Sequence, residues 1–249
     1  MHAQTIDEVI DQLDRIIKEC LADDSKLAFF PILYRKVTIA VKEGIERKDF
    51  DDNERMEKLD VVFANRYLTA YQQFKAGEKP TDSWQIAFDE AHAFWPIALQ
   101  HLLVGINAHI NLDLGIAAAE IADSDLPSLK ADFYKINSLL ASMVEGVQQE
   151  IGRISPVIEI LDLLAGKLDE RLVDFSIKIA RDGAWDFANE YNQAEASQRP
   201  TLISKRDFSI TWLGKDIMKP GRFLRVVAAF IKIFERKKVH KIAKALEGN

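Results

Sequence analysis

Hydrophobic residues recur at helical spacing along nearly the whole chain. A capping box, Thr5-x-x-Glu8, precedes the first apolar stripe and predicts a helix over 6–22. Similar stripes, interrupted by Gly, Pro and Asp, predict further helices over about 26–48, 53–77, 84–96, 100–123, 129–151 and 168–195. The pattern therefore predicts an all-α protein: a single-domain, multi-helix bundle of about eight to ten helices over residues 1–249.

The C-terminal part departs from this regularity. Phe208, Ile210 and Trp212 alternate with polar residues, which predicts an extended or irregular segment over 198–214. Residues 219–249 then predict a basic amphipathic C-terminal helix, with nine Lys or Arg residues and one acidic residue between positions 219 and 244.

The segment 100–123 breaks the helical pattern from within. Asn107, His109, Asn111 and Asp113 occupy every second position of an otherwise apolar run. Asn and Asp are poor residues for a helix interior, because their side chains compete for nearby backbone groups. A strand would place all four on one face, but it would lack a partner in a helical chain. A helix is favoured, and it would separate His109 and Asp113 from the two asparagines.

Buried polar side chains need partners, so this segment is the predicted functional site. His109 could act as a general base oriented by Asp113, the two predicted catalytic residues. The ligand would be a small polar molecule, bound or chemically transformed. A partly buried arginine, Arg35, Arg66 or Arg181, could pair with Asp113 or Asp60, or bind an anionic ligand. The expected ligand-binding residues are Asn107, Asn111, His101, Arg66 and Arg35. The alternative is a buried network that only fixes helix packing.

Two further functions remain open at this stage. The first is a metal-dependent hydrolase, with His109, Asp113, Glu120 and His101 as candidate ligands of a divalent metal. The second is a non-catalytic interaction protein whose C-terminal helix binds an acidic partner or a membrane surface. Its contact residues would be Arg225, Lys232 and Arg236. The pattern does not decide whether the protein is an enzyme, and it identifies no cofactor.

Composition limits the possible partners and the cellular location of the protein. The formal net charge of −6 argues against a nucleic-acid partner. The single cysteine, Cys20, excludes an intrachain disulfide, and with no signal-peptide pattern it favours a cytoplasmic location. We expect no transmembrane segment, because no uninterrupted apolar run reaches the length of a membrane span. The oligomeric state is left open.

Three blocks carry a family resemblance: FFPILYRKVT at 29–38, DDNERMEKLDVVFANRYLTAY at 51–71 and LQHLLVGINAHINLDLGIAAA at 99–119. Together they resemble a bacterial family known only as a domain of unknown function. The resemblance spans roughly residues 25–190 and implies a helical, bacterial, intracellular protein without supplying an activity. A fainter similarity links His109-x-x-x-Asp113 to a metal-lining helix of zinc-dependent phospholipases C, although their N-terminal Trp ligand is absent here.

Overall fold

The computed structural model describes residues 2–122, 125–136, 139, 177–235 and 238–248. Every regular element in these ranges is helical, which confirms the all-α multi-helix fold. The helices are α1 (Ile6–Ala22), α2 (Phe29–Glu46), α3 (Asn53–Lys75), α4 (Asp82–Asp89), α5 (Ala98–Ala108), α6 (Leu114–Ala122), α10 (Ile177–Gln193), α11 (Arg199–Met218), α12 (Arg222–Phe234) and α13 (Val239–Glu247), with a further helical run over 126–136. Short 3-10 turns precede α2 and follow α4.

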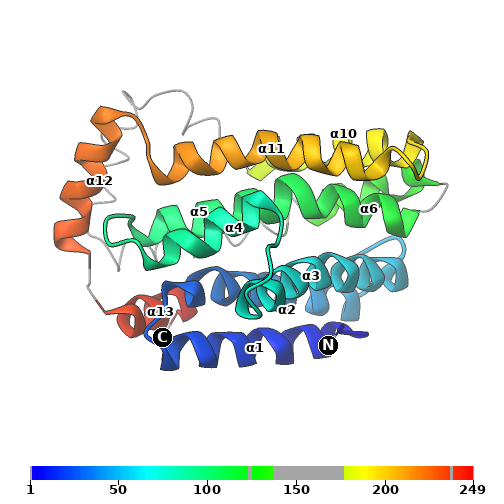
Figure 1. Ribbon diagram of the computed structural model, residues 1–249. Coiled ribbons are helices and arrows are strands. Elements are labelled where there is room, and N and C mark those ends of the chain that lie inside the picture. Colours follow the sequence, from blue (N-terminus) through cyan, green and yellow to red (C-terminus); the bar gives the residue numbers. More distant parts are fainter. Residues whose placement is uncertain (1, 123–124, 137–138, 140–176, 236–237, 249) are drawn as a thin grey trace.

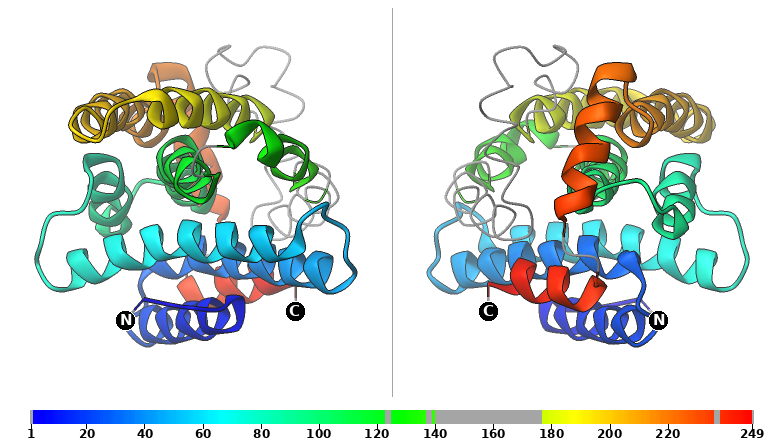
Figure 2. Two further views of the ribbon diagram at one scale, coloured as in Figure 1. Left: turned by 90° about the vertical axis from the view of Figure 1, so that its right-hand side faces the viewer. Right: turned by 90° about the vertical axis from the view of Figure 1, so that its left-hand side faces the viewer.

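One continuous helix runs through the middle of the molecule. It consists of α5, a π-helical segment η3 (His109–Asp113) and α6. Figure 1 shows it between α1, α2 and α3 on one side and α10 and α11 on the other, and the end-on views of Figure 2 show the same layering. By length and composition Ala98–Ala122 could cross a membrane, but 83% of its most apolar window is buried within the protein. We therefore assign this helix to the core.

The prediction of an irregular segment at 198–214 is wrong, because these residues belong almost entirely to α11. Phe208 and Trp212 lie four residues apart on the exposed side of this helix, with ring centroids separated by 6.3 Å. Ile210 points the other way and is buried. The alternation of Phe208, Ile210 and Trp212 with polar residues thus arises in a helix that exposes its two aromatic residues and buries the isoleucine between them.

The expected C-terminal helix over 219–249 is in fact two helices, α12 and α13. The break follows Phe234, because Glu235 has an extended backbone. The buried Glu235 carboxylate accepts hydrogen bonds from the backbone N–H of Ala98 and from Lys232. The helices predicted over 129–151 and 168–195 lie partly outside the described residues. Within the described part, residues 126–136 are helical, and α10 begins at Ile177.

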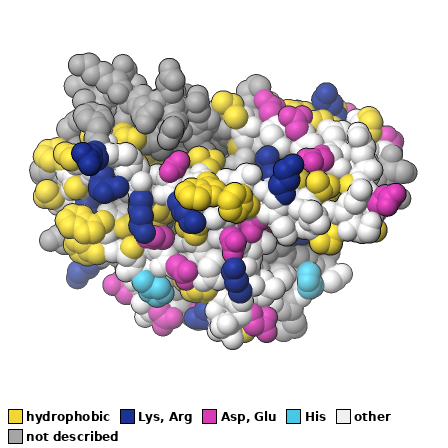
Figure 3. Space-filling view, turned by 45° about the horizontal axis from the view of Figure 1, so that its top comes forward, with side chains coloured by type: hydrophobic (Ala, Val, Ile, Leu, Met, Phe, Trp, Pro, Cys, Tyr) yellow, Lys and Arg dark blue, Asp and Glu magenta, His cyan; other side chains and the backbone are white. Residues whose placement is uncertain are grey.

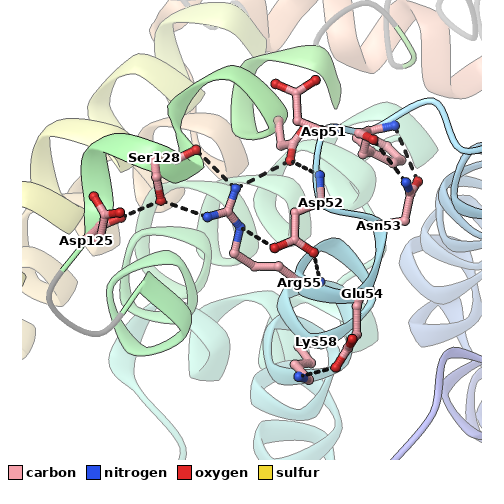
Figure 4. Close-up of polar contacts among 10 residues, drawn as sticks. Asp51, Asp52, Asn53, Glu54, Arg55, Lys58, Asp125 and Ser128 are labelled. Atoms are coloured by element: carbon pink, nitrogen blue, oxygen red, sulfur yellow. Dashed lines mark hydrogen bonds and ion pairs between the residues drawn. The ribbon is translucent and has the colours of Figure 1, made fainter.

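A distant carboxylate also fixes the start of α3. The buried Asp132 side chain accepts hydrogen bonds from the backbone N–H groups of Asp51 and Asp52, at 2.7 and 3.0 Å. Arg55 links the same carboxylate to Ser128, as Figure 4 shows. The N-terminus of α3 is thereby tied to the helical run 126–136, since carboxylates are favoured at helix N-termini.

Asp207 does the same for α4. Its carboxylate accepts hydrogen bonds from the backbone N–H groups of Asp82 and Ser83, at 2.7 and 3.0 Å. Together with Glu235 at α5, three helices begin on carboxylates supplied from elsewhere in the chain. These helices carry or face the site described below.

We predict that Gly115→Ala destabilises the protein by about 1–3 kcal/mol, because a Cβ there would lie 2.7 Å from the backbone oxygen of Ala184 on α10. The matched control is Gly214→Ala on α11, where the nearest atoms lie at 3.5 Å and helix propensity favours alanine. Urea unfolding of both variants tests this. Equal midpoints would mean that α6 and α10 are not packed this closely.

Candidate functional site

The polar segment of the central helix is a π-helical turn. The N–H of Leu114 reaches the carbonyl of His109, an i to i−5 bond in place of the usual i to i−4. The turn places His109 and Asp113 on one side and Asn107 and Asn111 on another, as expected for a helix. The strand alternative is therefore excluded. His109 and Asp113 are bonded to each other, whereas Asn107 donates to α11 and Asn111 donates to Asn107. Single π turns occur often at functional sites.

Asp113 is the centre of the first face. Its carboxylate is buried and accepts hydrogen bonds from Arg66 Nε at 2.9 Å, Trp84 Nε1 at 2.8 Å and His109 Nδ1 at 3.3 Å. Burial raises the pKa of Asp113, but the charge of Arg66 and the bonds from His109 and Trp84 outweigh it and hold that pKa below its usual value. The carboxylate is therefore ionised at neutral pH, and it forms an ion pair with Arg66, one of several pairings that the sequence left open.

His109 lies in a cage of aromatic rings. Phe63 stacks on it at 3.6 Å between centroids, and Tyr34 meets it edge-on at 4.5 Å. Burial lowers the pKa of His109, although Asp113 offsets part of this effect. The imidazole is thus neutral, and the bond to Asp113 assigns its proton to Nδ1. Its other nitrogen, Nε2, is buried with no hydrogen-bond partner in the described part of the chain.

Two more buried polar atoms also lack a partner in the described ranges: one belongs to Tyr34, which contacts the imidazole, and the other to Asp60, which lies near Tyr34. By distance and angle, neither the Tyr34 hydroxyl nor Asp60 Oδ2 makes a hydrogen bond within the described residues, and both atoms are buried, although the Thr38 side chain lies close enough to lower the pKa of Tyr34. Burial, with a contribution from Glu57, raises the pKa of Asp60 to about 7. Asp60 in turn lies close enough to raise the pKa of Tyr34 further, beyond the effect of burial. Tyr34, Asp60 and His109 therefore form a group of unsatisfied polar side chains, which we call the unpaired cluster.

The second polar face is fully used inside the protein. Asn107 Nδ2 donates to the carbonyl of Ile210 at 2.8 Å, and Asn111 Nδ2 donates to Asn107 Oδ1 at 3.0 Å. Gln100 further along α5 donates to the carbonyl of Ile217 at 2.7 Å. These bonds hold α5 against α11, so the two asparagines occupy packing positions rather than facing His109.

The remaining predicted site residues lie apart from this centre. His101 is buried beside Phe29, at 6.2 Å between centroids, and burial together with nearby lysines lowers its pKa to about 3. Arg35 pairs with Asp14, and both side chains are partly exposed. Glu120 is exposed on α6. Within the described ranges, no group of three or more His, Cys, Asp or Glu residues is arranged to hold a metal ion. The proposed metal set is therefore not assembled.

Comparison with family models shows which protein family the chain is related to. The model of a family of unknown function, DUF5995, matches residues 6–220. The chain belongs to this family. The match confirms the resemblance and extends it beyond residues 25–190. No curated protein and no solved structure gives a significant match. DUF5995 membership supplies no activity, so inferences about function rest on the geometry above.

Sequence reasoning placed His109, Asp113 and Arg66 together but missed Trp84, Tyr34 and Asp60 as parts of the site. Nothing in the sequence distinguishes Trp84 from a core aromatic, yet its indole N–H donates a hydrogen bond to the Asp113 carboxylate. Tyr34 lies on the apolar stripe of α2, where nothing distinguishes it from a core residue. An acidic residue beside the apolar stripe of α3 was the one available signal for Asp60.

We predict that Asp60→Asn changes how stability depends on pH. Folding raises the pKa of Asp60 to about 7, so between about pH 4 and pH 7 the folded protein holds a proton that the unfolded chain has released. This group therefore makes the free energy of unfolding fall as pH rises through that window, by about 4 kcal/mol at most. The stability of the variant relative to wild type should rise from pH 4 to pH 7 and then level off.

Urea unfolding at each pH measures this difference. The exposed Glu78→Gln variant is the control, and its stability relative to wild type should vary little with pH. Parallel curves for Asp60→Asn and wild type would show that Asp60 is ionised normally in the folded protein.

Proposed function

We propose that this protein binds a small polar molecule at the unpaired cluster, where α2, α3 and the π turn meet. The observation that supports the proposal is the set of three buried polar atoms, on Tyr34, Asp60 and His109, that lack partners in the described part of the chain. Each such atom costs about 1–3 kcal/mol. Three of them approach the whole net stability of a domain, about 5–15 kcal/mol, so a bound molecule that pairs them would strongly stabilise the fold.

The groups on offer define the ligand. Neutral His109 presents an acceptor at Nε2, and Tyr34 presents a hydroxyl donor. Asp60, with a pKa of about 7, is present in both protonation states near neutrality and can donate or accept. A hydroxyl or amide group suits this combination, because it both donates and accepts. Arg66 keeps 24% of its side chain exposed and favours a ligand that also carries an anionic substituent.

The same geometry supports proton transfer as a second function. Asp113, held ionised by Arg66 and Trp84, orients His109 through Nδ1, as a general base requires. His109 Nε2 would then accept a proton from the hydroxyl or amide of the bound molecule. We extend the proposal to the setting of the protein, which would act in the cytoplasm of a bacterium.

The variant Tyr34→Phe separates binding from stability. Removing an unpaired hydroxyl should leave the free energy of unfolding unchanged or raise it by up to about 1 kcal/mol. Tyr71→Phe is the matched control, because the Tyr71 hydroxyl lies 3.4 Å from Cys20 Sγ and its loss should cost about 0.5–1 kcal/mol. Urea unfolding of the ligand-stripped proteins gives both values. A large loss of stability for Tyr34→Phe alone would mean that its hydroxyl is paired.

Binding is tested by identifying what the purified protein retains. Small molecules released by heat from wild type, Tyr34→Phe and Tyr71→Phe are compared by mass spectrometry. We expect a compound enriched in wild type and Tyr71→Phe and depleted in Tyr34→Phe. Equal recovery from all three, or ordered water alone beside the cluster in a high-resolution crystal structure, would refute the proposal. A mass difference between the compounds retained by wild type and His109→Gln would indicate turnover rather than binding alone.

A further inference from the structure

Helix α12 is apolar on two sides. Its inner side chains Leu224 and Ile231 are buried, and Ile231 packs with Ile97, the residue just before α5. Its outer side presents Val226, which is 69% exposed, and Ile233, which is 68% exposed. These two lie seven residues apart and therefore share one face of the helix. A helix needs only one apolar side to pack on its own protein, so the outer stripe calls for another explanation.

A second exposed apolar feature lies beside this helix. Phe94 and Trp95, in the loop before α5, are 69% and 66% exposed and contact each other edge-on at 5.5 Å. They form one wall of a groove of about 470 Å³, and α12 contributes Ala228 and Ala229 to the other. The groove thus lies between the aromatic pair and α12, the helix that carries the stripe, and we call the aromatic pair, the groove and the stripe together the α12 surface.

Positive charge accompanies these apolar side chains. Lys219 and Arg225 line the groove, and Arg222 is exposed on α12. Figure 3 shows Lys and Arg side chains intermixed with hydrophobic ones at the end of the molecule where Figure 1 places α12. The stretch 219–244 holds nine basic residues and one acidic residue, although the chain as a whole carries −6. Three of these basic residues, Lys219, Arg222 and Arg225, lie on α12 or at the groove, where the apolar side chains are exposed, and Lys219 also pairs with Glu90 of the groove lining.

The contact residues expected from the sequence need correction here. Lys232 points inward, donating to the carbonyl of Pro96 and to Glu235, with only 16% of its side chain exposed. Arg236 lies outside the described residues. Arg225 does line the groove, although its guanidinium also donates to the carbonyl of Pro220. The candidate surface is thus the exposed apolar stripe with Arg222, Arg225 and Lys219, rather than the polar side of one long helix.

We propose that the α12 surface docks on a lipid bilayer that contains anionic phospholipid. Exposed Trp and Phe side chains suit the headgroup region, and the stripe of Val226 and Ile233 would enter the acyl boundary. Arg222 and Arg225 would pair with lipid phosphates and add electrostatic attraction. The negative charge on the rest of the chain would be repelled by the same lipids, which orients this end toward the membrane. A second copy fits less well, because a symmetric contact would bring like charges together.

Flotation with lipid vesicles tests the proposal on the full chain. Wild type should float with vesicles made of equal parts phosphatidylcholine and phosphatidylglycerol. It should float far less with phosphatidylcholine alone, and less at high salt. The double variant Val226→Glu/Ile233→Glu should bind at least about tenfold more weakly, since each change replaces an inserted apolar side chain by a repelled charge. Arg222→Ala/Arg225→Ala should lose affinity for the anionic vesicles only.

Matched variants separate docking from folding. Ile179→Glu removes an equally exposed side chain from α10, and Lys18→Ala removes an exposed cation from α1; both should float like wild type. Trp95→Ser changes a loop residue and should also weaken binding. The proposal can therefore be tested even if the α12 double variant does not fold. In wild type, brominated lipids should quench tryptophan fluorescence, and Trp95→Phe should lose most of that quenching.

Three outcomes would overturn the proposal. The first is failure of folded wild type to float with anionic vesicles. The second is equal flotation of wild type, the α12 double variant and Trp95→Ser. The third is a dimer in sedimentation velocity that the α12 double variant dissociates while vesicle binding is unaffected, because the stripe would then contact a second copy.

Discussion

The buried carboxylate of Asp113 constrains how the central helix meets its neighbours. An ionised carboxylate away from water must be surrounded by donors, or the cost of burial reaches several kcal/mol. Here the donors come from α3 through Arg66, from α4 through Trp84, and from the same π turn through His109. None of these helices can shift along its axis without removing a donor. The position of His109 among the aromatic rings follows from this arrangement.

The two polar faces of the central helix differ in a way that bears on function. Every amide bond described for Asn107, Asn111 and Gln100 reaches a protein partner, as expected where polar residues only specify packing. The opposite face has an equally well-bonded carboxylate, yet His109 Nε2 and two neighbouring polar atoms remain unpaired. Packing alone does not account for that difference, since an apolar residue of similar shape would be as well accommodated. The asymmetry between the faces is the reason to locate the ligand beside His109.

Much of the helix pattern could be predicted, because apolar periodicity reports directly on burial. The bounds of α1 and the start of α3 follow from local caps, and the His109–Asp113 pair follows from its i, i+4 spacing. The sequence could not show which partners come from far along the chain. Asp132, Asp207 and Glu235 accept hydrogen bonds at helix starts from backbone N–H groups that lie 80 to 137 residues away in the chain. The helical nature of 198–214 was hidden because the aromatic residues of α11 face solvent instead of the core.

Access to His109 is governed by the packing of its aromatic rings. Phe30, Tyr67 and Trp84 all contact the imidazole, and together with His101 they also line a void of about 20 Å³ on their far side. A space of that size holds about one water molecule.

A larger ligand that entered from this void would therefore have to displace a ring. Phe30 is held tightly, since its ring lies where a side chain on Gly105 would be, only 2.6 Å from the position of a Cβ. Lys26 borders the same void and donates to the carbonyl of Ala93, next to the exposed Phe94. Entry by this route would thus depend on ring motion beside the Phe94–Trp95 loop, so the rate of binding would be set by the packing of the core rather than by the chemistry of His109.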